Sequence, residues 1–168
     1  MSMNPNNLLN KYTTGGTLAI VLVFGFLAVQ SSGDPAANAA DQTAIKDVEA
    51  VVYKSPSCGC CGAWAQYAER RGMNVEVKEV RNLNQVKEKH DISRDKQSCH
   101  TTVVGDYVVE GHVPTSAINK LLSEEPDIQG IGLPGMPQGS PGMPGPKQED
   151  WKIYSLQEDG TTSTFMTV

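Results

Sequence analysis

The chain has 168 residues, with 14 lysines and arginines against 19 aspartates and glutamates, and its formal net charge at pH 7 is -5. This length suits one modest domain, and this charge provides no basic stripe of the kind that nucleic acid requires, so we expect no nucleic-acid partner. The four cysteines are confined to two places, "CGCC" at residues 58–61 and "CH" at residues 99–100.

The first 39 residues differ in composition from the rest of the chain. Lys11 precedes the apolar run Leu18–Val29, and the small residues Ala37-Asn38-Ala39 follow. A run of this length is short for a helix that crosses roughly 30 Å of hydrocarbon, and the pattern is typical of a signal peptide cleaved before Ala40. The scarcity of positive charge leaves an uncleaved membrane anchor as the alternative, and this segment is the only membrane contact that we expect. Under both interpretations the domain is exported from the cytoplasm.

After a linker at residues 40–47, residues 48–125 alternate between strand-like and helix-like patterns. The predicted strands are 48–53, 74–80 and two short ones on either side of the turn Gly105-Asp106, and the predicted helices are 61–71, 82–92 and 115–125. Right-handed crossovers between parallel strands then give an α/β fold with a small central mixed sheet flanked by helices. This order resembles that of thioredoxins over residues 48–122, in which a dithiol lies where the first strand meets the first helix.

The C-terminal part of the chain has a different composition. Residues 126–150 are rich in proline and glycine, and their triplet period breaks at Gln138, so we predict a constrained Pro/Gly loop that presents Met136 and Met143 rather than a collagen helix. The segment 151–168 predicts a β-hairpin that is added to the domain.

The clustered cysteines are compatible with a disulfide staple, a redox dithiol or a soft-metal site. Outside the cytoplasm free thiols are protected by disulfide formation, by catalytic turnover or by metal. The neighbours Cys60 and Cys61 cannot both easily reach distant partners, which argues against two simple staples. Without metal, we expect Cys58 and Cys61 to form a disulfide.

In thioredoxin-like enzymes a proline precedes the third strand and lies against the dithiol. Alignment of "CHTTVVGDYVVEG" with that strand places Cys99 and His100 there, in the loop that faces the first cysteine motif. The predicted metal ligands are Cys58, Cys60, Cys61, Cys99 and His100. Thiolates with imidazole suit Cu(I) or Zn(II), and bridging thiolates can share several Cu(I) ions, whereas a tetrahedral zinc site would leave Cys60 without a role.

Three further residues have two interpretations each. The thioethers of Met136 and Met143 either pack the Pro/Gly loop or bind copper, and a thioether is a good ligand for Cu(I) but a poor one for Zn(II). His112 follows the second strand of the hairpin, where it is either an exposed turn residue or a ligand of a second metal site.

The segments "SPSCGCCGAW", "SCHTTVVGDYVVEGHVP" and "GLPGMPQGSPGM" together resemble the CopG-like proteins of bacterial copper-resistance systems. The resemblance extends from about Val48 to Met143. It implies a thioredoxin-like fold, export to the periplasm, and copper bound through the C-x-C-C and C-H motifs.

The leading hypothesis is therefore a periplasmic protein that sequesters Cu(I), as a thiolate-bridged cluster, and that cycles the oxidation state of copper during metal stress. The alternative is a thioredoxin-like thiol-disulfide oxidoreductase with Cys58 or Cys61 as the nucleophile and Cys99 as a further resolving thiol. Metal binding is favoured over turnover because the proline that aligns a substrate peptide is missing. A third hypothesis is an adaptor that docks to a copper exporter or oxidase through the Pro/Gly loop.

Overall fold

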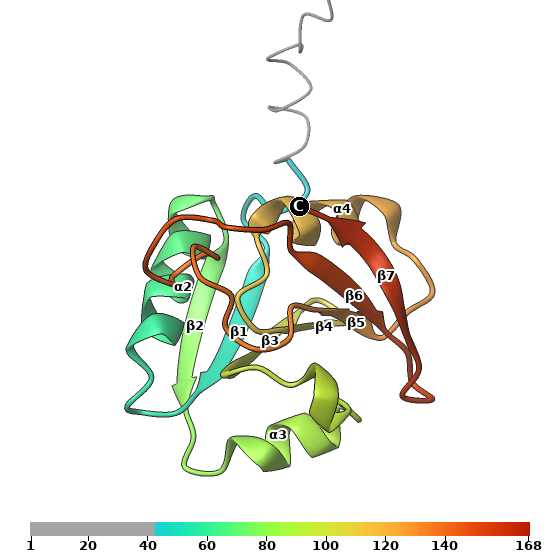
Figure 1. Cartoon of the computed structure of the whole chain (residues 1–168), viewed down its shortest axis with the longest axis horizontal. Helices are drawn as coiled ribbons and strands as arrows, with labels where there is room; N and C mark the ends of the chain where they lie inside the picture. The colour runs from blue at the N-terminus through green and yellow to red at the C-terminus, as the bar shows by residue number, and fades with distance from the viewer. Residues whose placement is uncertain (1–42) are drawn as a thin grey trace, which may run out of the picture. The chain divides into compact units, whose positions relative to one another are not determined.

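The fold is that of a computed structural model of the chain, which describes residues 43–168 (Figure 1). The predicted signal peptide, residues 1–39, and the first residues of the predicted linker lie outside the described residues. Within the described part of the chain, no helix is both long enough and apolar enough to cross a membrane.

The first seven β-strands and α-helices follow the predicted order. They are β1 (Glu49–Lys54), α2 (Gly59–Arg70), β2 (Asn74–Glu79), α3 (Leu83–Lys89), β3 (His100–Val104), β4 (Tyr107–Glu110) and α4 (Thr115–Glu124). A short 3-10 helix, η1 (Arg94–Lys96), lies between α3 and β3. The ends of these strands and helices have local causes. Ser55-Pro56 follows β1, Gly72 ends the α2 region at a φ of 100° that favours glycine, and Pro126 lies just beyond α4.

Three more strands complete the sheet, β5 (Gly130–Gly132), β6 (Lys152–Leu156) and β7 (Thr162–Thr167). The predicted C-terminal hairpin is confirmed by the antiparallel pairing of β6 with β7. β5 was not expected, because it lies within the segment 126–150 that we predicted to be a loop. Gly130 allows this pairing, since a Cβ there would lie 1.9 Å from the carbonyl oxygen of Val108.

The strand order in the sheet is β2-β1-β3-β4-β5-β6-β7. β1 pairs in parallel with β2, and β4 pairs in parallel with β5, whereas the other neighbours are antiparallel. The predicted α/β class with a mixed sheet and flanking helices is confirmed.

The helices are divided between the two faces of the sheet. Consecutive side chains of a strand point to opposite faces, so His100 and Thr101 of β3 separate. His100 contacts Trp64 of α2, whereas Thr101 contacts Lys87 of α3. Trp64 shares the main apolar core with Ile118 of α4, so α2 and α4 pack on one face and α3 lies apart from them on the other (Figure 1).

The packed domain begins before β1. Ile45, which we predicted to belong to the linker at residues 40–47, is fully buried in the core, and the backbone N–H of Ala44 donates to Asn119 of α4. The segment between β5 and β6 returns across the sheet to the start of α2 (Figure 1). There, a Cβ on Gly142 would lie 2.7 Å from the carbonyl oxygen of Cys60. The loop therefore packs directly on the first cysteine motif.

Candidate metal centre

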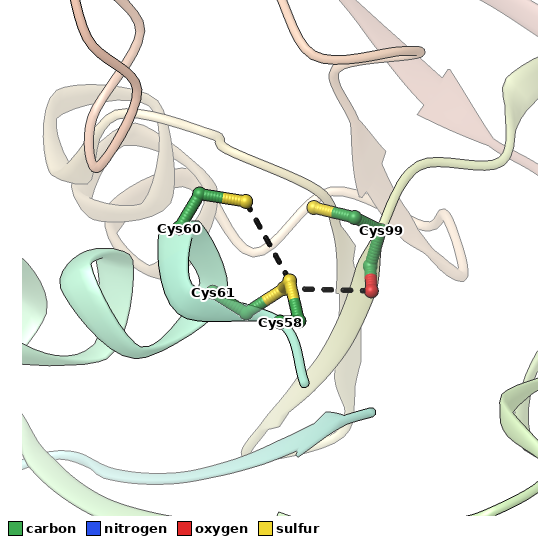
Figure 2. A group of neighbouring side chains, drawn as sticks. All are labelled: Cys58, Cys60, Cys61 and Cys99. Carbon is green, nitrogen blue, oxygen red and sulfur yellow. Dashed lines mark hydrogen bonds between the residues drawn. A yellow bond between two sulfur atoms is a disulfide. The ribbon is translucent and has the colours of Figure 1, made fainter. Parts of the chain in front are cut away.

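Three of the predicted ligands lie at the N-terminus of α2. The chain leaves β1 through a turn in which the N–H of Cys58 donates to the carbonyl of Ser55, and Cys58 is the N-cap residue of the helix. Cys58 and Cys61 are joined by a disulfide, which is the pair that we expect to oxidise, with their Cα atoms 5.4 Å apart. The free thiol of Cys60 lies 3.5 Å from the Cys58 sulfur (Figure 2).

Cys99 reaches this helix start because of the sheet register. β3 is antiparallel to β1, and His100 is opposite Lys54, so the residue before His100 lies beside the turn that leads into α2. The Cys61 sulfur is 3.6 Å from the carbonyl oxygen of Cys99. The side chains of Cys60 and Cys99 point toward one another (Figure 2), and the four sulfur atoms all lie within 4.8 Å of one another.

His100 is more enclosed than expected. We predicted a loop residue, but it is the first residue of β3, and its exposed fraction is 0%. Its ring lies 4.9 Å from the ring of Trp64 and 4.9 Å from that of His112, measured between centroids. Its Nδ1 is 3.5 Å from the Cys99 sulfur, and its Nε2 is buried without a hydrogen-bond partner among the described residues. A buried ring nitrogen without a hydrogen-bond partner is available to bind a metal ion.

His112 is fully buried, so its interpretation as an exposed turn residue is wrong. Its Nε2 lies 2.8 Å from the Cys99 sulfur, and its Nδ1 lies 2.7 Å from the carbonyl oxygen of Pro141. A carbonyl oxygen only accepts, so Nδ1 carries the hydrogen, and the lone pair of Nε2 faces Cys99. A histidine that ligates a metal is commonly oriented in this way, through a backbone carbonyl.

The role of Pro141 is not predicted by the sequence. The sequence predicts the Pro/Gly loop that contains Pro141, but no local pattern in the loop shows that it covers α2. The ligand atoms of Cys99, His100 and His112 lie within 4.8 Å of one another. Cys99 therefore belongs both to the sulfur cluster and to a thiol-imidazole group.

The two methionines of the loop differ in exposure. The Met136 side chain is 53% exposed, and it follows Gly135, whose carbonyl accepts a hydrogen bond from the Ser98 hydroxyl. Met143 is half-buried and follows Gly142, which packs on Cys60. The structure thus brings the backbone of both predicted thioether residues beside the two cysteine motifs.

Burial controls the protonation of the site. It lowers the pKa of His100 well below the usual value for histidine, with smaller effects from His112 and Lys87 in the same direction. It also lowers the pKa of His112, against the opposing effect of the Pro141 hydrogen bond. Burial, followed by the nearby Cys60, raises the pKa of Cys99 to about 11.

At neutral pH both imidazoles are therefore neutral and can act as ligands, whereas the Cys99 thiol keeps its proton. A metal ion must displace that proton to bind the thiolate. Soft sulfur with neutral imidazole is a donor set for Cu(I) or Zn(II) and a poor one for hard cations such as Mg²⁺ or Ca²⁺.

The fold and these side chains define a class, that of α/β proteins with a cysteine- and histidine-rich group that fits copper binding. Two solved structures, of a "copper resistance protein copG" in its form 1 and form 2, each share 34% sequence identity with this chain at a TM-score of 0.68. Each alignment covers 73% of this chain, and it covers 98% of the form 1 chain and 99% of the form 2 chain. The chain belongs to the CopG family, which confirms the resemblance found in the sequence.

A second comparison agrees with this assignment. Residues 96–143 match the family described as "Protein of unknown function, DUF411". That range contains Cys99, His100 and His112 as well as both loop methionines. The comparison with curated proteins gave no match.

Proposed function

We propose that this protein takes up copper as Cu(I), its cargo, through Cys58, Cys60, Cys61 and Cys99 with His100 and His112 on the Cys99 side. The observation that carries the proposal is the convergence of four sulfur atoms within 4.8 Å of one another. Sulfurs this close can bridge neighbouring Cu(I) ions, which favours a small cluster over one tetrahedral ion. The names of the solved relatives point to the same metal.

Reduction must precede full loading. An external dithiol reductant, which itself becomes a disulfide, converts Cys58–Cys61 to two thiols, and these release their protons to solvent when the metal binds to sulfur. Copper and oxidation therefore compete for the same two sulfurs. In this proposal the reduced protein sequesters Cu(I) in the periplasm during copper stress, and it cycles the oxidation state of copper.

The Pro/Gly loop supports two finer parts of the proposal. In this proposal Met136, which is exposed and follows Gly135, receives Cu(I) first, and Met143, which follows Gly142, completes the site; the exposure of Met136 and the contact of Gly142 with Cys60 support these roles. The same exposed loop is the surface on which we expect a copper exporter or oxidase to dock. Substitution of each methionine by leucine, which keeps the volume and removes the sulfur, tests these roles through the rate and the extent of copper loading.

The main experiment is an anaerobic titration of the reduced, metal-free protein with Cu(I), and in parallel with Zn(II), with bound metal counted after desalting. More than one copper retained per chain, with zinc lost, is the expected result. A single retained ion would contradict the cluster. His90→Ala is the matched control, because His90 lies at the end of α3 and is outside the group of ligand atoms.

A second candidate function is that of a thiol-disulfide oxidoreductase. The disulfide at the N-terminus of α2 favours it, since the helix dipole and free N–H groups there stabilise an attacking or leaving thiolate. Rapid reduction of insulin disulfides by the reduced protein, together with no retained copper, would support this function over copper binding.

A further inference from the structure

A buried ion pair lies on the face of the sheet opposite α2. It joins Lys87 of α3 to Glu110 of β4, and the exposed fractions of the two side chains are 4% and 0%. Neither residue is among the proposed copper ligands, although Glu110 lies two positions before His112.

The carboxylate of Glu110 contacts both sides of the Cys99-His100 pair. Its Oε1 accepts a hydrogen bond from the backbone N–H of Ser98 at 2.6 Å, and its Oε2 accepts one from the Thr101 hydroxyl at 2.6 Å. Lys87 also donates to the Thr101 hydroxyl at 3.1 Å. One buried carboxylate therefore holds the residue before Cys99 and the residue after His100.

The same carboxylate is rigidly tied to the segment that carries His112. The backbone N–H of Gly111, the residue after Glu110, donates to the carbonyl of His100 at 2.9 Å. A Cβ on Gly111 would lie 2.5 Å from the Ser98 side chain, so the two segments touch at this point. The side chain of Glu110 and the backbone of Gly111 together hold the segments that carry Cys99, His100 and His112.

A buried ion pair is a costly way to stabilise a core, and well-packed apolar residues often serve equally well. Hydrogen bonds to an ionised carboxylate are, however, short and directional. We infer that Glu110, held in place by Lys87, is a positioning residue that sets the separation of Cys99, His100 and His112 from the thiols of α2. This inference rests on the proposed copper site, but the geometry it concerns can be measured without metal.

Two double variants separate positioning from stability. Lys87→Met/Glu110→Gln removes both charges but keeps a side-chain oxygen that can accept the Ser98 N–H. Lys87→Met/Glu110→Leu removes both charges and the acceptor. Neither variant leaves an unpaired buried charge, which is the defect that makes single substitutions in such pairs strongly destabilising.

We expect the glutamine variant to bind Cu(I) like the wild type in an anaerobic competition with a chromophoric chelator. We expect the leucine variant to bind roughly 10- to 100-fold more weakly, the range found when partners that orient metal ligands are lost. The unfolding midpoints of the two variants in urea should be similar. Equal copper affinity in both variants would mean that the pair acts in folding alone.

The metal-free measurement is the yield of crosslinking between Cys60 and Cys99 by a short bifunctional thiol reagent, in protein that keeps the Cys58–Cys61 disulfide. We expect wild-type yield in the glutamine variant and a clear loss in the leucine variant. If wild-type protein retains no copper, the proposed function fails, but the yield of the Cys60–Cys99 crosslink still decides whether Glu110 is a positioning residue. Unchanged yield in the leucine variant would overturn it.

If the leucine variant does not fold, Thr101→Val replaces it. This change keeps the volume and the Lys87–Glu110 pair. It removes the Thr101 hydroxyl, and with it one of the two hydrogen bonds to Glu110 that flank Cys99-His100 as well as the hydrogen bond from Lys87. Loss of one such bond is expected to weaken Cu(I) binding about fivefold. Wild-type affinity and wild-type crosslinking in Thr101→Val would then overturn the inference.

Discussion

Substitution of His100 separates its packing role from its ligand role. The ring is fully buried between Trp64 and His112. His100→Ala leaves a cavity, and large-to-small changes at such sites cost about 2–5 kcal/mol of unfolding free energy. His100→Leu keeps a similar volume and removes an Nε2 that has no hydrogen-bond partner in the described structure, so we expect a change below about 1.5 kcal/mol. Both variants lose the imidazole and should bind copper more weakly.

The same residue makes the stability of the metal-free protein depend on pH. Burial holds the folded-state pKa of His100 well below its usual range, whereas the unfolded chain has a value near 6.5. Between these values the unfolded chain binds a proton that the folded protein excludes, so stability decreases as pH falls below about 6.5. The contribution of His100 to this slope is up to about 1.4 kcal/mol per pH unit. His112, whose pKa is also lowered by burial, adds to it.

The assay is urea unfolding of metal-free protein with the Cys58–Cys61 disulfide intact, at several values between about pH 5 and 7.5. We expect His100→Leu to be nearly as stable as the wild type at the upper end and to lose less stability toward the lower end. If His100→Leu loses as much unfolding free energy toward low pH as the wild type, the assignment of a buried neutral imidazole is refuted. Equal stability of the alanine and leucine variants would refute the packing argument.

Three further predictions concern copper directly. Cys60→Ser should lower the number of Cu(I) ions retained per chain without changing the unfolding midpoint, and unchanged loading would favour a site built on Cys58 and Cys61 alone. Because burial raises the pKa of Cys99 to about 11, its thiol must lose a proton on binding, so Cys99 alone should contribute up to about a tenfold rise in Cu(I) affinity per pH unit, and the rise should be less steep in Cys99→Ser. Gly142→Ala adds a Cβ 2.6 Å from the backbone nitrogen of Trp64, at a position where the φ of Gly142 is 83°. It should therefore destabilise the protein by more than about 1 kcal/mol, and it should weaken copper binding by displacing the Pro141 carbonyl. Wild-type stability of Gly142→Ala would contradict the packing of the Pro/Gly loop on α2.

Local patterns were sufficient for most of the fold. The apolar run of β1, the helix that contains Cys60 and Cys61, and the hairpin at Gly105-Asp106 each have their own periodicity and their own turn residues. β5 has neither. Its three residues, Gly130, Ile131 and Gly132, are held by β4 on one side and β6 on the other, so only the assembled sheet shows that they form a strand.

The site divides in the same way. The convergence of Cys99 on the first motif follows from the order of the strands, which the sequence indicates through the resemblance to thioredoxins. The burial of His112 does not, because it depends on a loop 29 residues further along that brings Pro141 over it. Lys87 on a polar helix and Glu110 at the end of a short strand also have no local signal for pairing, since the register of β4 and the placement of α3 are both needed.

Oxidation removes only some of the donor atoms from the proposed copper site. The disulfide occupies Cys58 and Cys61, whereas Cys60 and Cys99 remain free thiols, and both imidazoles keep their places on the far side of Cys99. Cys99 is not part of the disulfide, and its position follows from β3, which begins at the next residue and pairs with β1. In the proposed copper site, a two-electron oxidant that closes the α2 disulfide would remove two sulfurs from the donor set, whereas the imidazoles lie on other segments of the chain. The bond that forms lies within one turn of α2, so copper release by this route would not require the sheet to unfold.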